Sequence, residues 1–99
     1  MYIYNTTFNV ATSVASDFLA WMKSECQPTA KRFSQHVRFL HVHTQQEDCE
    51  TYTLQVECDD LESLSHYEKE AFIKLMESLR AKFGKEVLPF STLLEDITL

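Results

Sequence analysis

Six polar side chains in this sequence have the types and positions from which a small-molecule site could be built. They are three amides, a guanidinium, an imidazole and a carboxylate, and all lie in segments typical of strands or helices: Asn5, Asn9, Arg38, His41, Gln55 and Glu68. Small-molecule sites usually combine a mostly apolar cavity with a few polar groups of this kind. No motif among the six specifies a reaction, so they are ligand-binding candidates, and neither catalytic residues nor an enzymatic activity can be assigned from them.

Glu68 is the most informative of the six, because its helical angle places it inside an apolar stripe, between Leu64 and Phe72. A carboxylate there must reach the helix edge, pair with a donor, or become hard to ionise. One hypothesis is that Glu68 pairs with Arg38, Lys82 or a strand histidine. The other is a perturbed acid in a cleft. Arg38 in turn could join such an ion pair or bind an anionic ligand.

His41 and His43 form an H-x-H pair, a spacing that binds zinc or copper when a third ligand comes from elsewhere in the fold. The pattern is also common by chance among half-buried strand histidines. The cysteines, Cys26, Cys49 and Cys58, form no C-x-x-C pair, and no phosphate loop, G-x-S-x-G or H-E-x-x-H motif is present. We therefore predict no bound metal and no cofactor, and cysteines that fill space in reduced form.

Composition narrows the classes of partner. The chain carries a net charge of -6 and a pI of about 5.1, so its surface should repel nucleic acid, and its one basic pair is Lys31-Arg32. No apolar run approaches the roughly 20 residues of a membrane helix, and no secretory signal opens the chain. We expect one soluble, cytoplasmic domain over residues 1–99, with no nucleic-acid or membrane partner.

Alternating apolar and polar residues predict four strands, over residues 2–10, 36–44, 50–58 and 86–94. The second and third should form a hairpin with about four or five loop residues, because no Asn-Gly or Asp-Gly turn signal lies between them. Pro89 lacks a ladder donor, which places the last strand at a sheet edge or a bulge. For residues 36–44 the alternation does not decide which face is buried.

The first predicted helix begins at a Thr12 or Ser13 cap and ends near Cys26. Pro28 is tolerated in the first turn of a helix but not in its interior. Residues 27–35 are therefore predicted as a turn with at most one or two helical turns.

A capping box, Asp59 with Glu62 three residues later, opens the second predicted helix, and Gly84 stops it in the left-handed conformation. Its apolar residues recur at about 100° per residue as one broad stripe. The stripe consists of Leu61, Leu64, Ala71, Phe72, Leu75, Met76, Leu79 and Phe83.

The order β-α-β-β-α-β predicts an α+β, ferredoxin-like sandwich, a four-stranded antiparallel sheet with two helices on one face. The helices should cover the face that holds Tyr4, Phe8, Val10, Tyr52, Leu54 and Val56. The other face would display Ile3, Asn5, Thr7, Asn9, Thr51, Thr53, Gln55 and Glu57. Amides and threonines suit a partly buried polar surface whose groups bond one another. We expect two such faces to meet in a homodimer; the alternative is a solvated face.

Several segments spread over nearly the whole chain are similar to those of one known family. They are MYIYNTTFNV at residues 1–10, Trp21-Met22-Lys23, the strand around Gln55, Tyr67-Glu68 and the ending Phe90-Ser91-Thr92-Leu93-Leu94-Glu95. The sequence thus resembles an uncharacterised bacterial family of domains of unknown function, mostly from Bacteroidetes. The resemblance implies a ferredoxin-like dimeric α/β barrel and supplies no activity. Family members tend to have His-Ile-Pro where this chain has Cys26-Gln27-Pro28.

These observations predict an uncharacterised small protein that forms a homodimer through its open sheet face, with a small-molecule ligand as a further partner. The alternative is a small cofactor-independent enzyme of the dimeric α/β barrel type, similar to monooxygenases, with a pocket between helices and sheet. A third hypothesis is a partner-protein module that uses the edge strand near Pro89. An enclosed cavity of roughly a few hundred Å³, reached by two or more of the six candidates, would favour the enzyme, and a filled core the interaction hypotheses.

Overall fold

The chain folds into one antiparallel sheet of four strands, and its two long helices lie on the same face of that sheet. The computed structural model describes residues 1–99. The strands are β1 Tyr2–Ala11, β2 Val37–Val42, β3 Cys49–Cys58 and β4 Val87–Glu95. Their order in the sheet is β2-β3-β1-β4. The predicted α+β, ferredoxin-like class is confirmed.

Each long helix is a composite of α-helical segments joined by a π-helical turn. The first consists of the 3₁₀ turn η1 Thr12–Val14, α1 Ala15–Trp21, the π turn η2 Met22–Cys26 and α2 Gln27–Ala30. The second consists of α3 Leu61–Tyr67, the π turn η3 Glu68–Phe72 and α4 Ile73–Phe83, followed by the 3₁₀ turn η4 Gly84–Glu86.

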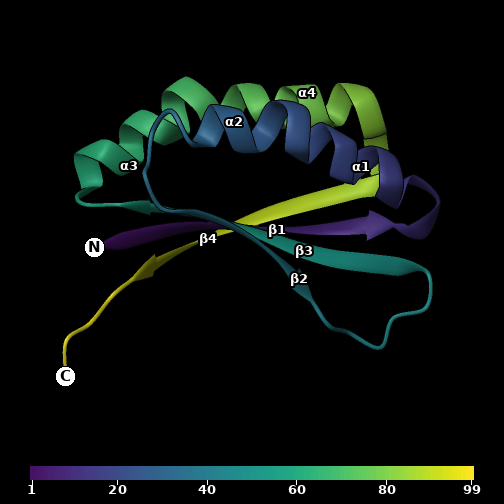
Figure 1. Ribbon diagram of the computed structural model, residues 1–99, viewed down its shortest axis with the longest axis horizontal. Helices are drawn as coiled ribbons and strands as arrows, with labels where there is room; N and C mark the ends of the chain where they lie inside the picture. Colours follow the sequence, from purple (N-terminus) through teal and green to yellow (C-terminus); the bar gives the residue numbers. More distant parts are fainter.

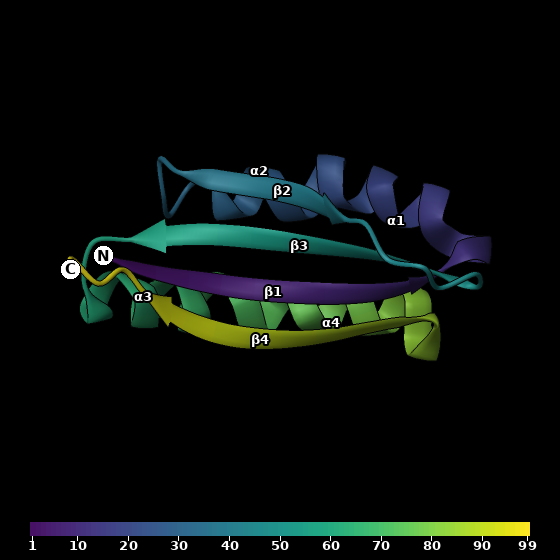
Figure 2. The same ribbon diagram turned by 90° about the horizontal axis from the view of Figure 1, so that it is seen from below.

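The two faces of the sheet differ in what covers them. Figure 1 shows both helices lying side by side above the strands, with nothing below. Figure 2, seen from below, shows the strands in front of the helices. We call the uncovered side the open face.

The register of β1 assigns side chains to the two faces. Tyr4 lies opposite Val56 of β3, whereas Asn5 lies opposite Gln55 of β3 and Thr92 of β4. Because side chains alternate along a strand, the even-numbered residues of β1 face the helices and the odd-numbered ones the open face. The predicted division of β1 and β3 between the two faces is therefore confirmed.

The structure also decides the face of β2. Phe39 lies opposite Leu54 and His41 opposite Tyr52, and both partners belong to the helix side. The open face accordingly receives Arg38, Leu40 and Val42. The strand is shorter than predicted, and residues 43–48 connect it to β3 as a longer loop than expected.

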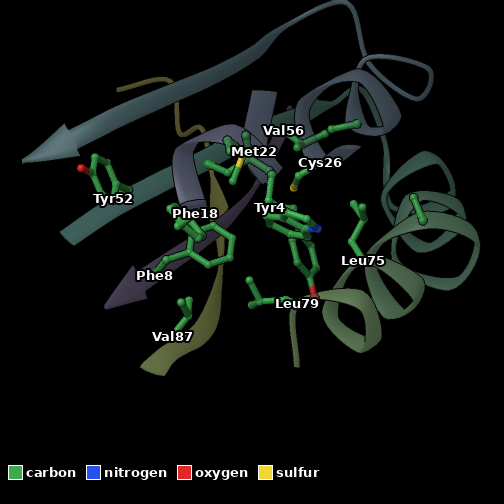
Figure 3. Packing of buried hydrophobic residues seen from close by; sticks show 14 of the residues in the cluster. Tyr4, Phe8, Phe18, Met22, Cys26, Tyr52, Val56, Leu75, Leu79 and Val87 are labelled. Atoms are coloured by element: carbon green, nitrogen blue, oxygen red, sulfur yellow. The ribbon is translucent and has the colours of Figure 1, made fainter. Parts of the chain in front are cut away.

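Aromatic rings pack together with aliphatic side chains in the core between helices and sheet (Figure 3). Phe8, Phe18 and Trp21 are completely buried, and the ring of Phe18 lies 5.1 Å from that of Phe8 and 5.7 Å from that of Tyr52. Full burial of a large apolar side chain contributes about 1.5–3 kcal/mol, and a well-placed aromatic pair adds about 0.5–1.5 kcal/mol. These contacts hold the first helix against β1 and β3.

The prediction for the first helix was wrong at its N-terminal end and is confirmed at its C-terminal end. Neither Thr12 nor Ser13 caps it: Ala11 precedes η1 and Val14 precedes α1 at the N-cap positions, and neither side chain makes a capping hydrogen bond. At the other end the π turn η2 ends at Cys26, and α2 forms a single helical turn over Gln27–Ala30, as predicted for this segment. Proline is normally excluded from a helix interior by its missing N–H and by a clash with the carbonyl one turn earlier. Pro28 follows η2 and lies in the first turn of α2, a position that tolerates proline because its missing N–H costs no bond within that turn.

The second helix differs from its prediction in cap and in stripe. Asp60, not Asp59, is the N-cap, and its Oδ1 accepts from the Ser63 N–H at 2.7 Å. Leu61, predicted to be packed, is 54% exposed, whereas Tyr67, absent from the predicted stripe, is 1% exposed. The π turn η3 inserts extra residues into one turn and so rotates the buried stripe between the two halves of the helix.

Two local predictions at the C-terminal end are confirmed. Gly84 ends the second helix with φ at +58°, in the left-handed region that favours glycine. Pro89 lies on β4, an edge strand whose one neighbour is β1.

Candidate functional site

The centre of the open face is a hydrogen-bonded network around Asn5. Its Oδ1 accepts from Thr53 Oγ1 at 2.6 Å and from Gln55 Nε2 at 3.3 Å, and its Nδ2 donates to Thr7 Oγ1 at 3.5 Å. The side chains come from the adjacent central strands β1 and β3. The expectation that these polar groups pair with one another is met in the geometry.

The network extends towards both ends of the face. Arg38 Nη2 donates to Gln55 Oε1 at 3.1 Å, and Thr51 Oγ1 donates to Asn9 Oδ1 at 3.1 Å. Four of the six ligand-binding candidates therefore share this face: Asn5, Asn9, Arg38 and Gln55. Arg38 bonds a neutral amide, so its positive charge has no carboxylate partner within the chain.

The polar centre is flanked by apolar side chains on both edge strands. On β4, Leu88 and Phe90 are each 57% exposed and Leu94 is 39% exposed. On β2, Leu40 is 40% exposed and Val42 is 37% exposed. We call these five residues the apolar rim. Exposed apolar side chains gathered on one face, unlike scattered ones, mark interaction sites.

Charge on the open face is sparse and balanced. The register places one cation, Arg38, and one anion, Glu57, on this face. The remainder of the surface carries the excess negative charge of a chain with net charge -6.

His41 lies on the opposite side of the sheet from the network. Its Nε2 donates to Glu50 Oε2 at 2.9 Å, and its ring lies 5.0 Å from that of Tyr52 and 4.8 Å from that of His43. No group of three or more His, Cys, Asp or Glu side chains is arranged to hold a metal ion. His41 therefore does not join Asn5, Asn9, Arg38 and Gln55 in one site.

Glu68 also lies on the helix side, and its partner is one that the helical pattern did not reveal. Tyr4 Oη donates to Glu68 Oε2 at 2.7 Å. Neither Arg38, Lys82 nor a histidine, the partners predicted from sequence, bonds this carboxylate. Burial, and then the bond to Glu68, raise the pKa of the Tyr4 hydroxyl to about 12, so Tyr4 remains a donor at neutral pH.

A second buried hydroxyl was also missed. Thr6 is 1% exposed, and its Oγ1 shares a hydrogen bond with Ser91 Oγ at 3.1 Å. The alternation of β1 does place Thr6 on the helix side with Tyr4 and Phe8. A threonine there needs a partner, and this was the signal that sequence reasoning could have used.

The buried thiols are held in the unreactive form. Burial, and then the charge of Glu25, raise the pKa of Cys26 to about 12. Burial, and then the charge of Asp59, also raise the pKa of Cys58. A thiol is nucleophilic only as thiolate, so these two cysteines act as packing residues at neutral pH.

Three hollows open at the surface, and none of the six candidates lines any of them. The largest, about 790 Å³, lies between the α2–β2 connection and the start of α3, where Arg32, His36 and Asp59 are among its mostly polar walls. The candidates therefore lie on a flat sheet face or pair within the protein.

A family profile described as a domain of unknown function, DUF4286, matches residues 1–97. This chain belongs to the DUF4286 family. The predicted resemblance to a family of unknown function is thus confirmed at that level. No curated protein sequence matches the chain. No helix in this DUF4286 structure has the length and apolar character needed to cross a membrane.

Solved structures similar to this DUF4286 chain share its fold at very low sequence identity. A crystal structure of an Agrobacterium tumefaciens protein has a TM-score of 0.70 and 8% identity, covering 98% of this chain and 94% of that one. A dimeric ferredoxin-like protein from an uncultured marine organism has a TM-score of 0.66 and 10% identity, covering 99% and 96%. A de novo designed protein has a TM-score of 0.63 and 10% identity, covering 97% and 98%. A fold shared with a designed protein points to no activity.

Proposed function

We propose that this DUF4286 protein forms a homodimer in which the open faces of two sheets pack against each other. The observation that carries the proposal is the make-up of that face, a polar centre bonded to itself between two apolar edges. Removing water from the amides and hydroxyls of this centre costs little free energy, because these groups keep their hydrogen-bond partners. Burying the apolar rim then supplies the stabilising free energy.

The apolar rim is exposed enough for its burial to stabilise a dimer measurably. Complete burial of a Leu, Val or Phe side chain contributes about 1.5–3 kcal/mol. Leu88 and Phe90 are each 57% exposed, so each has roughly 1 kcal/mol left to gain on association.

The charge distribution favours a second copy as the occupant of the face. Two chains of net charge -6 repel each other. The open face carries a single opposite pair, Arg38 and Glu57, and so adds no net charge to the contact. It is therefore a surface through which the chain can meet itself with little repulsion at close range.

The area of the face is sufficient for a specific dimer. Strands β1 and β3 have 10 residues each and the sheet has four strands. At about 3.3 Å per residue and about 4.8 Å between strands, one face measures roughly 600 Å². Two faces would bury about 1,200 Å², the lower end of the range for specific interfaces. The similar marine protein is itself described as dimeric, which supports the proposal by analogy.

The same face is also the best-supported place for a small ligand, as an alternative occupant to the second copy. Asn5, Asn9, Arg38 and Gln55 supply amide donors, amide acceptors and one cation there. Since Arg38 has no carboxylate partner, we infer that the ligand carries a negative charge. Native mass spectrometry of protein purified at low salt should detect it, and Arg38→Gln should abolish its retention.

The monooxygenase-like alternative receives less support. Enzymes of that kind enclose substrate in a cavity reached by polar groups. The space between helices and sheet is filled here by rings such as Trp21, Phe8 and Tyr67, each at most 1% exposed. A filled core of this kind favours the interaction hypothesis.

Light scattering coupled to size-exclusion chromatography tests the homodimer at tens of micromolar. The expected mass is about twice 11.6 kDa. Phe90→Lys should give a monomer, because it places a charge in the apolar rim. Leu61→Lys is the matched control, since Leu61 is 54% exposed on α3, away from the open face, and should leave the dimer intact. A monomeric wild-type protein, or variants with equal effects, would refute the proposal.

A further inference from the structure

We propose that the C-terminal half of β4, Ser91–Glu95, pairs edge to edge with the same segment of a second copy, joining two sheets by antiparallel main-chain hydrogen bonds. This inference rests on the proposed homodimer and deepens it, because it names the strand and the register that hold the second copy. It is carried by the phase of the hydrogen bonds along β4 and by the position of Pro89.

A hydrogen bond at the end of β4 shows which of its residues bond β1 and which direct their main-chain groups to the free edge. The Asp96 N–H donates to the Met1 carbonyl at 3.0 Å. Opposed residues in an antiparallel pair alternate between bonding each other and turning their main-chain groups away. Even-numbered residues of β4 therefore bond β1, and odd-numbered residues direct their N–H and C=O groups to the free edge. Pro89, which has no N–H, falls in the outward phase, where it costs no bond to β1.

The two halves of this edge differ in what they offer. The unpaired main-chain groups of an edge strand can bond another strand, and proline hinders this because it has no N–H. Pro89 hinders such pairing along the N-terminal half of β4. The C-terminal half keeps an outward donor and acceptor at Ser91, Leu93 and Glu95, with nothing beside them in the chain.

The side chains and path of this segment favour a second copy. Leu93 is 51% exposed on the helix side and Leu94 is 39% exposed on the open side, so pairing would bury apolar surface on both faces. Figure 1 shows the C-terminal end of β4 leaving the helices and running towards the open side of the sheet. The second copy of the proposed homodimer lies on that side.

The outward-facing main-chain groups also favour one register between the two copies of β4. A two-fold pairing centred on Leu93 places Leu93 opposite Leu93 of the second copy and Ser91 opposite Glu95, with about six hydrogen bonds. A centre nearer the N-terminus would bring Pro89 into the paired segment and lose donors. A centre on Glu95 would set two carboxylates against each other.

Amide hydrogen exchange on the wild-type protein tests the inference directly. In the dimer the amides of Ser91, Leu93 and Glu95 should exchange at least about tenfold more slowly than in the diluted monomer. Dimerisation with equal exchange at these amides would overturn the edge pairing and leave the face-to-face homodimer standing. A protein that stays monomeric at every concentration would refute both.

Two variants of Leu93 give a second test. Leu93→Pro removes one outward donor and no bond to β1, as Pro89 already does naturally, and should weaken dimerisation by at least about tenfold. Leu93→Ala keeps the N–H and should weaken it less. Equal effects of the two variants would show that the side chain, not the main-chain bond, matters, and would overturn the inference. Circular dichroism checks that Leu93→Pro is folded, and the wild-type exchange experiment decides if it is not.

Discussion

Removing the hydroxyl of Tyr4 should destabilise the protein through one identifiable bond. Tyr4→Phe deletes the donor that Glu68 Oε2 accepts at 2.7 Å and leaves the ring in place. The ring packs 4.9 Å from that of Phe72 and 5.6 Å from that of Tyr67, so its apolar contacts remain. The loss therefore isolates the link between β1 and the π turn η3.

The expected size of the effect follows from burial. Hydrogen bonds to charged groups contribute about 1.5–3 kcal/mol, more than neutral ones. Tyr4 is 7% exposed, so water hardly competes for its hydrogen bond to Glu68 in the wild type. Glu68 is half-buried, and water can reach its carboxylate once the hydroxyl is gone. We therefore expect the free energy of unfolding to fall by about 1–2 kcal/mol.

Urea unfolding measures this change. With a slope of about 2 kcal/mol per molar urea, in the middle of the range for a small protein, the midpoint should fall by roughly 0.5–1 M. Glu68→Gln keeps an acceptor and should cost less. A double-mutant cycle of the two changes should give a coupling energy of about 1 kcal/mol.

A neighbouring tyrosine supplies the control. Tyr2 lies on the same strand and face, and its hydroxyl lies beside the exposed Glu95 at the sheet edge. Tyr2→Phe should cost less than Tyr4→Phe, since water competes for that contact. An unchanged midpoint for Tyr4→Phe, or no coupling with Glu68→Gln, would show that the bond does not stabilise the fold.

Two further predictions concern the core. Burial raises the pKa of Tyr4 and Cys26 each to about 12, from ordinary values of 10.0 and 9.0, so above pH 9 the folded state holds more protons than the unfolded state. The contribution of these two groups to the free energy of unfolding should be constant below about pH 9, so the free energy of unfolding should fall as pH rises from 9 towards 12, less steeply in Cys26→Ala; a flat urea profile from pH 9 to 11 would contradict this. Trp21→Phe removes the bond from Nε1 to Ser78 Oγ at 3.3 Å and leaves a gap, costing about 1–2 kcal/mol in thermal unfolding, with Ser78→Ala accounting for a smaller part.

The sheet and the order of elements were predictable because alternation is a local property of strands. The set Tyr4, Phe8 and Val10 on one side, and Asn5, Thr7 and Asn9 on the other, is written directly in the first ten residues. The long helices were predictable for a similar reason, since their stripes extend over several turns. What failed was local: the helix caps predicted at Thr12 or Ser13 and at Asp59.

A π turn explains the errors in the predicted buried stripe of the second helix. A helical wheel assumes about 100° per residue throughout, whereas η2 and η3 each interrupt that period. The interruption moved Leu61 out of the core, brought Tyr67 in, and set Glu68 at the position where it meets Tyr4. No single-residue preference marks such a turn, so periodicity could not have located it.

The structure places the six ligand-binding candidates on both sides of the sheet, and the sequence did not show this division for a different reason. Asn5, Asn9 and Gln55 were correctly grouped, because they lie on strands with a clear alternation. His41 lies on β2, whose two faces are equally apolar in sequence, and only pairing with β3 decides its side. Face assignment of such a strand is a property of the sheet, not of the segment.

For the same reason the sequence did not reveal the apolar rim, on which the proposed association depends. The central strands show a polar open face, and alone they fit solvation as well as burial. The apolar rim comes from Leu40 on β2 and Phe90 on β4, on edge strands whose faces are known only from register. A polar centre inside an apolar rim reverses the usual arrangement of a protein interface, which has an apolar core and a polar rim. Association through such a face must therefore draw its free energy from the edges, so substitutions at Phe90 or Leu88 should matter more than substitutions at Thr51.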